Sequence, residues 1–172
     1  MNRAAVVLIL NSLEEEISLL LVRRAVRQDD PWSGQMAFPG GYMAAQDISV
    51  LDTAIREARE EVGINLLDHE LIGTINNVRS ARRPLIVTPF VALLRNKVVL
   101  TLQKNEVAEA TWAPIRDLLR IPLIKRRIKT SEGELEVDGM KYRDQIIWGL
   151  TLRMIKDFLS RLDDGMDAPR NL

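Results

Sequence analysis

The sequence predicts a layered α/β domain, and two features of its apolar residues point to this fold class. Short apolar runs of strand length recur along the chain, separated by polar segments or by turns containing Gly and Pro. Two longer segments, one early and one near the C-terminal end, carry apolar residues at helical spacing. Strands interspersed with two substantial helices are typical of an α/β layered domain. We assign residues 1–162 of the 172 to one such domain and expect 163–172 to form a flexible tail.

The N-terminal part is predicted to form a hairpin followed by a loop. Residues 4–10 and 17–22 are apolar runs joined by a polar link, which indicates two paired strands. Residues 24–35 form a polar loop that contains Pro and Gly as breakers. A short strand over 36–38 then leads into the Gly-Gly turn at 40–41.

A helix is predicted over residues 48–62. Its apolar residues recur every three to four positions and form one buried face. They are Leu51, Ala54, Ile55, Ala58 and Val62. Gly63 suits the position just after the helix, because a positive φ angle costs glycine nothing.

Strands are predicted again beyond this helix, from further apolar runs. They cover residues 71–76, 85–94, 97–102 and 108–113. The run 97–102 is expected to pair with 85–94 through a turn at Arg95-Asn96. A small helix is expected to start at Pro114 and to reach Arg120.

The C-terminal part is predicted to form a second hairpin and a long helix. Asp138-Gly139 is a strong hairpin signal between short strands at 135–137 and 140–142. The helix that follows carries one apolar stripe, which we interpret as core, with a dimer contact as the alternative. The stripe consists of Ile147, Leu150, Met154, Phe158 and Leu162.

Three carboxylates on the first helix are candidates for a metal site. Glu57, Glu60 and Glu61 are related as i, i+3 and i+4, so they project from one face of the helix. Crowded carboxylates repel one another, and a divalent cation stabilises them because hard cations bind oxygen ligands. The alternative is a solvated face on which Arg56 and Arg59 pair along the helix. The spacing R-E-x-x-E-E-x-G is expected by chance in roughly 1 of 10⁴ chains of this length, which favours a site.

Composition excludes several other classes of function. The 24 basic and 24 acidic residues give a formal net charge of zero, which argues against a general nucleic-acid binder. The chain has no cysteine, and its one histidine, His69, is expected at the surface. Residues 4–10 are too short to span a bilayer, and the N-terminus does not resemble a signal peptide. We therefore expect a soluble cytoplasmic protein with no membrane partner and a possible homodimer.

The segment from Gly41 to Ile64 resembles the Nudix box, whose pattern is G-x5-E-x7-R-E-U-x-E-E-x-G-U, with U an aliphatic residue. The chain reads Gly41-x5-Asp47-x8-Arg56-Glu57-Ala58-Arg59-Glu60-Glu61-Val62-Gly63-Ile64. Asp47 stands where the pattern has its first Glu, and one additional residue precedes Arg56. Both departures fall in the loop and at the helix entrance, and they leave the role of Asp47 open.

The Nudix resemblance implies a fold, a cofactor and a reaction. The fold would be an α/β/α sandwich with a mixed sheet between helices. The reaction would be hydrolysis of the diphosphate linkage in a nucleoside diphosphate joined to another group X, assisted by Mg²⁺ or Mn²⁺. Arg56 would orient a glutamate. The metal ligands implied by position are the Gly40 carbonyl, Glu57, Glu60 and Glu61.

The resemblance does not fix which glutamate acts as the general base. Glu57 is one candidate, and the others are Glu106 and Glu109, just before the strand at 108–113. Of the latter two we favour Glu106. A non-catalytic nucleotide-sensing module would be expected to lose box carboxylates, whereas this chain keeps all three.

Two further segments resemble the coenzyme A pyrophosphatase branch of the family. They are the LLxxR motif at 20–24 and the GQ-x-x-FPGG motif at 34–41, and the tract at 147–151 is similar as well. The branch pattern has His two residues before its Gly-Gln, where this chain has Trp32. The resemblance implies coenzyme A or acyl-coenzyme A as substrate. The alternatives are ADP-ribose, dinucleoside polyphosphates and nucleoside triphosphates.

Six residues are candidates for binding that substrate. Arg24, Gln35 and Gly41 lie within the resembling segments. A basic loop adds Arg79, Arg82 and Arg83, because guanidinium groups match the oxygens of the coenzyme A 3′-phosphate. The alternative for these three is an ordinary basic surface loop. Trp32 either stacks on a base or fills the loop.

Overall fold

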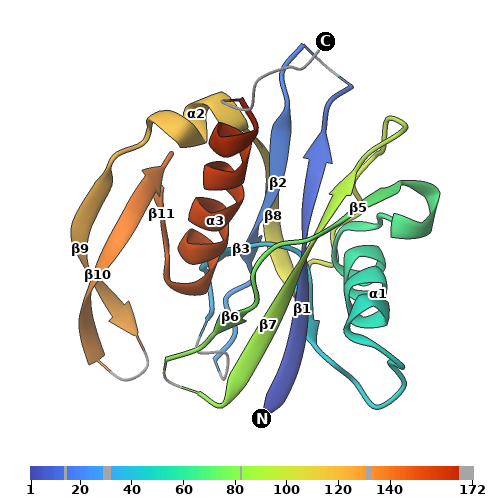
Figure 1. Ribbon diagram of the computed structural model, residues 1–172. Helices are drawn as coiled ribbons and strands as arrows, with labels where there is room; N and C mark the ends of the chain where they lie inside the picture. The colour runs from blue at the N-terminus through green and yellow to red at the C-terminus, as the bar shows by residue number, and fades with distance from the viewer. Residues whose placement is uncertain (14, 29–31, 82, 131–132, 167–172) are drawn as a thin grey trace.

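The centre of the molecule is an eight-stranded sheet in which strands β3, β2, β1, β7 and β5 lie side by side (Figure 1). The computed structural model describes residues 1–13, 15–28, 32–81, 83–130 and 133–166. The strands of this sheet are β1 Asn2–Asn11, β2 Ser18–Arg24, β3 Met36–Ala37, β4 Gly40–Tyr42, β5 Glu70–Thr74, β6 Val78–Arg79, β7 Leu85–Leu93 and β8 Val107–Pro114. Strands β4, β6 and β8 pair with β1, β7 and β2 respectively. Because β1 and β7 are parallel and the other pairs antiparallel, the sheet is mixed, as expected.

Helices cover both faces of this sheet, and a second sheet of three strands lies on one side. The helices are α1 Val50–Val62, the 3-10 helix η1 Leu66–Asp68, α2 Ile115–Arg120 and α3 Gly149–Met166. The second sheet consists of β9 Leu123–Thr130, β10 Gly133–Tyr142 and β11 Gln145–Trp148. Figure 1 shows α1 on one side of the central strands, with α3 and the second sheet on the other. This arrangement confirms the α/β/α sandwich.

The alternation of side chains along β1 divides the core into two parts. Ala5, Val7 and Ile9 face α1 and pack with its buried residues. The intervening Leu8 and Leu10 face the opposite way, into the part of the core that includes α3. The interpretation of the α3 stripe as core is confirmed, although its first member, Ile147, belongs to β11.

Helix α1 begins and ends with strong local signals. Ser49 caps its N-terminus through a reciprocal capping box with Asp52. Gly63 ends it in the left-handed conformation, with φ 76°. The helix thus starts two residues later than predicted, at Val50, and ends at Val62 as expected.

Residues 97–102, which we predicted to be a strand paired with 85–94, form no strand. The segment crosses the C-terminal end of α1, where helix carbonyls need partners. The Thr101 N–H donates to the Val62 carbonyl, and the Gln103 N–H to the Glu61 carbonyl, each at 3.0 Å. Alternate side chains of this segment pack on the α1 side of the core. Capping the helix therefore replaces strand pairing.

The turn predicted at Asp138-Gly139 is also wrong, because both residues lie within β10. Strand β9 was not predicted. It pairs with β10 across the residues where the turn was expected, and Lys125 Nζ lies 2.8 Å from Asp138 Oδ1. Gly139 is needed inside the strand, since a Cβ there would lie 2.6 Å from Ile146 Cγ2. The chain turns instead between β10 and β11, where Arg143 has φ 52°.

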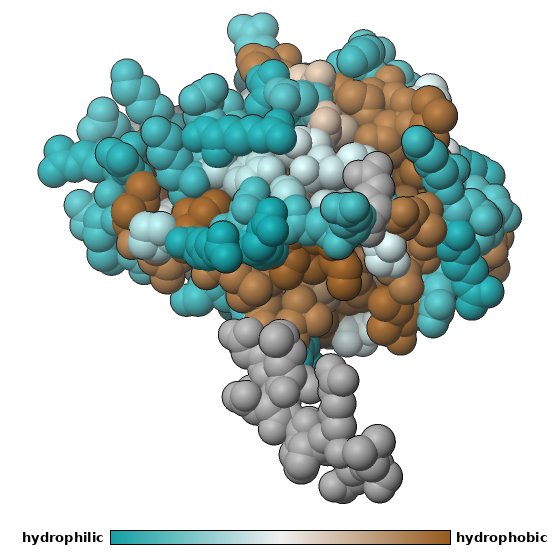
Figure 2. All heavy atoms as spheres, turned by 90° about the horizontal axis from the view of Figure 1, so that it is seen from above, coloured by the Kyte–Doolittle hydropathy of each residue, from teal (hydrophilic) through white to brown (hydrophobic). Residues whose placement is uncertain are grey.

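Helix α3 extends to Met166, and residues 167–172 of the expected tail lie outside the described part of the chain. None of the helices in the described ranges has the length and apolar composition needed to cross a membrane. Figure 2 looks down on the end of the molecule that holds the β1–β2 turn, where apolar surface lies among hydrophilic residues. The exposed apolar residues of that turn include Leu13 and Ile17. The homodimer stays a prediction.

The Gly63 cap gives a test of the fold. Gly63→Ala should lower the free energy of unfolding by about 2 kcal/mol, because it combines a left-handed backbone with a close contact. An added Cβ would lie 2.9 Å from Thr101 Cβ. Gly149→Ala is the matched control, since Gly149 has φ 62° but nothing within 4 Å of an added Cβ. Gly149→Ala should lower the free energy of unfolding by only about 1 kcal/mol. Urea unfolding measures both, and equal losses would contradict the contact at Thr101.

Candidate metal-binding and catalytic site

Arg56 on α1 connects the loop that precedes the helix to the carboxylates on the helix. Its Nε and Nη2 atoms donate to the two carboxylate oxygens of Asp47, at 3.0 and 2.9 Å. Its Nη1 atom donates to Glu57 Oε1 at 2.8 Å and to Glu60 Oε2 at 3.0 Å. Nη2 also reaches the Tyr42 carbonyl at 3.2 Å. The planar guanidinium thus fixes a loop, a strand end and a helix relative to one another.

Asp47, whose role the sequence left open, is the buried partner of Arg56. It is only 8 % exposed and also accepts hydrogen bonds from the Ala44 N–H and the Thr53 hydroxyl, both at 2.9 Å. The hydrogen bonds from Arg56 hold the pKa of Asp47 well below its usual range. The same contact raises the pKa of Arg56, so the pair stays ionised. An Asp at the place of the first Glu in the box pattern therefore anchors Arg56.

Three carboxylates meet at the end of the sheet next to α1. Glu57 and Glu61 are 8 % and 3 % exposed, whereas Glu106 is exposed. One carboxylate oxygen from each lies within 4.8 Å of the others. Glu106 comes from the segment just before β8, and its backbone carbonyl accepts the Ala25 N–H at 2.8 Å. The fold thus adds a residue from a distant part of the sequence to the pair on α1.

The Gly-Gly turn lies against this pair and has room only for glycine. The Gly40 N–H donates to Glu61 Oε2 at 3.0 Å. A Cβ on Gly40 would lie 2.6 Å from Val6 Cα, because β4 pairs with β1 at this point. A Cβ on Gly41 would lie 2.7 Å from Glu57 Cδ. Both glycines therefore allow the backbone to approach the carboxylates.

The electrostatics of the buried pair suit a divalent cation. Burial raises the pKa of Glu57, against the opposing effect of Arg56. Burial also raises the pKa of Glu61 to about 7, and the negative charge of Glu57 contributes to this increase. Buried oxygen donors that gain from a nearby positive charge are the ligand type that Mg²⁺ and Mn²⁺ prefer. The residues present thus fit such an ion, with Glu57, Glu61 and Glu106 as the group able to hold it.

The remaining residues predicted for the metal site and the general base lie nearby. Glu60 is 53 % exposed in its side chain and pairs with Arg56, outside the group of three carboxylates. Gly40 lines the same pocket as Glu57 and Glu61. Glu109 pairs with Arg23 at 3.3 Å, and its side chain is 57 % exposed. The ligand roles of Glu60 and Gly40 stay predictions.

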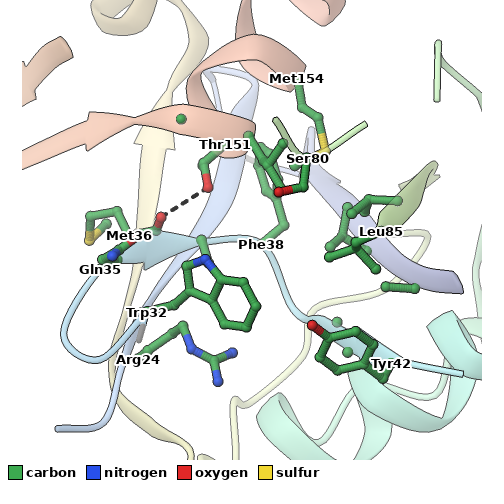
Figure 3. A pocket seen from close by; sticks show the side chains of 18 of the residues that line it. Arg24, Trp32, Gln35, Met36, Phe38, Tyr42, Ser80, Leu85, Thr151 and Met154 are labelled. Atoms are coloured by element: carbon green, nitrogen blue, oxygen red, sulfur yellow. Dashed lines mark hydrogen bonds between the residues drawn. The ribbon is translucent and has the colours of Figure 1, made fainter. Parts of the chain in front are cut away.

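The three carboxylates line a pocket of about 520 Å³. Figure 3 shows this pocket from close by, with Arg24 and Gln35 among its labelled side chains. Of the residues predicted to bind substrate, Arg24, Gln35, Gly41 and Arg83 line this pocket. The Arg79 side chain is exposed and is not part of the lining. Arg82 lies outside the described residues.

Several pocket residues were not identified from the sequence. Tyr42 pairs with Trp32 at a ring-centroid distance of 6.4 Å, and the Arg83 guanidinium lies 4.8 Å over the Trp32 ring. Trp32 therefore faces the pocket. The sequence had left open whether this residue stacks on a base or fills the loop. The α3 residues of the pocket were not identified, because their apolar stripe was interpreted as core, with a dimer contact as the alternative. The other unidentified residues include Phe38, Ser80, Leu85, Trp148, Thr151 and Met154.

Comparison with known proteins shows the family to which this chain belongs. Residues 1–132 match the family model described as the NUDIX domain. The chain belongs to the Nudix family. A Nudix hydrolase named NudL from Photorhabdus laumondii is 34 % identical over 155 residues, which are 90 % of this chain and 82 % of that protein. This Nudix chain is also 39 % identical, over 118 residues, to an uncharacterized Schizosaccharomyces pombe protein, covering 64 % of the chain but only 36 % of the yeast protein.

A solved structure supports the same fold. The NUDIX domain of Shewanella oneidensis NrtR, crystallised with ADP-ribose, superimposes with a TM-score of 0.62. The match covers 93 % of this chain and 87 % of that one, at 21 % identity. At this identity the likeness shows the Nudix fold alone.

The buried contact between Asp47 and Arg56 gives a prediction about stability and pH. Asp47→Asn should lower the free energy of unfolding by about 3 kcal/mol at pH 7, because it removes the buried carboxylate that binds two donor atoms of Arg56. The pKa of Asp47 in the folded protein lies below the value of about 3.9 in an unfolded chain. The stabilisation is therefore complete above that pH and is lost as pH falls.

Chemical denaturation of both proteins between pH 7 and pH 3 measures this effect. The difference between wild type and Asp47→Asn should shrink as pH falls below about 4. Asp52→Asn is a control on the same helix, because Asp52 caps the N-terminus without contacting Arg56. If the difference in free energy of unfolding between wild type and Asp47→Asn did not change with pH, this would contradict the assignment of Asp47 as an ionised partner of Arg56.

Proposed function

We propose that the protein is a metal-dependent hydrolase that cleaves the diphosphate linkage of a nucleoside diphosphate joined to another group. The observation that carries this proposal is the group formed by Glu57, Glu61 and Glu106, which opens beside a Gly-Gly turn into a pocket of about 520 Å³. Carboxylates of this kind hold Mg²⁺ together with substrate phosphates. The pocket leaves space for a substrate beyond the phosphates.

Glu57 and Glu61 form the centre of the proposed metal site, with Glu60 and the Gly40 carbonyl as further ligands. When bound, the ion would neutralise charge on the diphosphate and lower the pKa of a coordinated water. Arg56 keeps Glu57 in place through the contact at 2.8 Å. The Gly40 N–H does the same for Glu61.

Glu106 is the residue to which we assign the role of general base. Glu57 and Glu61 are the proposed metal ligands, and each also accepts a hydrogen bond, from Arg56 and from the Gly40 N–H respectively. Glu106 is exposed and lies on the pocket wall beside them. A base in this position can take the proton from an attacking water.

Coenzyme A or an acyl-coenzyme A is the substrate we propose, with 3′,5′-ADP and a phosphopantetheine as products. The pocket joins the carboxylates to two chemically different parts. One part holds Trp32, Tyr42 and Arg83, which suit a base and a phosphate. The other part is largely apolar, which suits the methyl and methylene groups of the pantetheine arm better than a second ribose or nucleotide.

ADP-ribose is the second candidate. The NUDIX domain of NrtR, which has a similar fold, was crystallised with ADP-ribose. Dinucleoside polyphosphates and nucleoside triphosphates contain the same phosphoanhydride linkage and are further alternatives. A module that binds nucleotides without hydrolysis is the remaining alternative.

Product analysis on a panel of substrates tests the proposal. The panel contains coenzyme A, ADP-ribose, NADH, diadenosine polyphosphates and dGTP, each with Mg²⁺ or Mn²⁺. We expect coenzyme A to give 3′,5′-ADP with the highest kcat/KM. If another member had the highest kcat/KM, that compound would replace coenzyme A as the proposed substrate. No hydrolysis of any member would contradict an enzymatic function.

Glu106 can be tested against Glu109, which lies three residues further along the chain. Glu106→Gln should lower kcat by about 10²- to 10⁴-fold, the usual contribution of a general base. Glu109→Gln should change kcat less than about threefold, because Glu109 pairs with Arg23 outside the carboxylate group. Initial rates with Mg²⁺ measure both variants. Equal losses in the two variants would contradict the assignment.

Arg83 tests recognition of the 3′-phosphate. Arg83→Ala should lower kcat/KM for coenzyme A by about tenfold and leave dephospho-coenzyme A nearly unchanged, because a charged hydrogen bond is worth about 1.5–3 kcal/mol and Arg83 is exposed. Arg79→Ala is the matched control from strand β6, just before the loop that carries Arg83, because the Arg79 side chain lies outside the lining. Equal losses on both substrates would assign Arg83 to another part of the substrate.

A further inference from the structure

Strand β9 is a free edge of the second sheet. The sheet has the order β11-β10-β9, so β9 has a partner strand on one side only. Figure 1 shows β9 at the outer margin of the molecule, with β10 and β11 between it and α3. Within the described part of the chain, no backbone hydrogen bond joins β9 to an element other than β10. The N–H and C=O groups along the outer side of this eight-residue strand can therefore bind another extended segment.

The side chains of this edge are strongly basic. Strand β9 contains no Asp or Glu, and its four Lys and Arg residues are all exposed. They are Lys125, Arg126, Arg127 and Lys129. Because successive side chains of a strand point to opposite faces, Lys125, Arg127 and Lys129 share one face and form a basic row. Arg126 lies on the other face.

Strand β10 shows which side chains pair with the basic row. The residues opposite Lys125, Arg127 and Lys129 in the register of the two strands are Asp138, Glu136 and Glu134 respectively. Lys125 Nζ contacts Asp138 Oδ1 at 2.8 Å. Among the described residues, the side chains of Arg127 and Lys129 have no hydrogen bond or ion pair, so their charges stay available to a second strand. Opposite charges facing one another across two strands stabilise the pairing.

The basic row disfavours two other occupants of this edge. A β9 strand from a second copy would place like charges opposite one another, which destabilises strand pairing. A nucleic acid would neutralise the charges but would leave the N–H and C=O groups of the edge without a partner strand. An extended protein segment with carboxylates satisfies both the charges and the backbone.

We propose that β9 is a docking edge for an acidic extended segment of another protein, which adds to the second sheet as its outermost strand. The segment carries Asp or Glu at alternate positions, as β10 does, so that its carboxylates meet the basic row. This inference goes beyond the proposed function and does not depend on it. Of the β9 residues, only Thr130 lines the pocket that holds Glu57 and Glu61. The docking edge would thus attach the protein to a partner through a surface that is separate from the carboxylates.

Fluorescence anisotropy of a labelled peptide tests the docking edge. The probe has the sequence of residues 133–140, which carries the three carboxylates of β10 at alternate positions. It should bind the wild type. A control peptide with Gln and Asn in place of these Glu and Asp residues should bind about tenfold more weakly, because each opposite-charge pair contributes up to about fivefold in Kd. No binding of the acidic probe, or equal binding of both peptides, would overturn the proposal.

Variants of the second sheet separate strand docking from a general attraction between charges. The double variant Arg127→Gln, Lys129→Gln should weaken binding of the probe about tenfold, because it removes two charges of the basic row. Arg126→Gln, Lys141→Gln is the matched control, since it removes two exposed charges from the other face of the same sheet. This control should change Kd less than about twofold. Circular dichroism checks that both variants are folded, and equal losses would overturn the docking edge.

Two N-methylated versions of the probe test the backbone pairing. One carries methyl groups on the amides of its odd-numbered residues and the other on those of its even-numbered residues, so their charges are equal. Because only alternate amides of a strand face its neighbour, one version should bind and the other should not. Equal behaviour of the two versions would overturn strand addition. Tighter binding of single-stranded DNA than of the probe would assign the edge to nucleic acid, and a wild-type dimer that Arg127→Gln, Lys129→Gln alters would assign it to a second copy.

Discussion

The candidate site depends on the contact between Arg56 and Asp47. One guanidinium group contacts Asp47, Glu57 and Glu60, and it also binds the Tyr42 carbonyl at the end of the Gly-Gly strand. The Asp47 side chain is the most buried of the three carboxylates, and its low pKa keeps it charged. A lysine would keep the charge but lose the planar arrangement of donors. The orientation of α1 toward the strand β4, and with it the position of Glu57, follows from this contact.

The central sheet brings the other parts of the site to the same place. Pairing of β4 with β1 places Gly40 against the backbone of Val6, and the Gly40 N–H then meets Glu61. Pairing of β8 with β2 places Glu106 beside the two glutamates of α1. Helix α3 covers the opposite face of the sheet and forms the far wall of the pocket. The reaction centre and the far wall of the pocket thus come from helices that pack on opposite faces of the sheet.

The sequence predicts those features that local chemistry determines. The apolar spacing of α1, its end at Gly63 and the crowding of Glu57 and Glu61 all follow from helical geometry. The sequence did not predict the structural role of Asp47, because that role depends on how the loop before α1 folds back to place Asp47 against Arg56 on the helix. Strand β9 was missed because its basic residues are paired by charge across β10, as Lys125 is with Asp138, rather than by burial. The pocket wall at Met154 was missed because a buried stripe and a cavity wall have the same apolar pattern.

Binding of Mn²⁺ tests the central claim, that the buried carboxylates held by Arg56 and Gly40 form a divalent-metal site. Electron paramagnetic resonance of the free ion measures this binding directly at pH 7.5, above the pKa of about 7 for Glu61. The wild type should bind Mn²⁺, and the folded double variant Glu57→Gln, Glu61→Gln should lose this binding. Equal affinity in the two proteins, or no binding by the wild type, would contradict the claim.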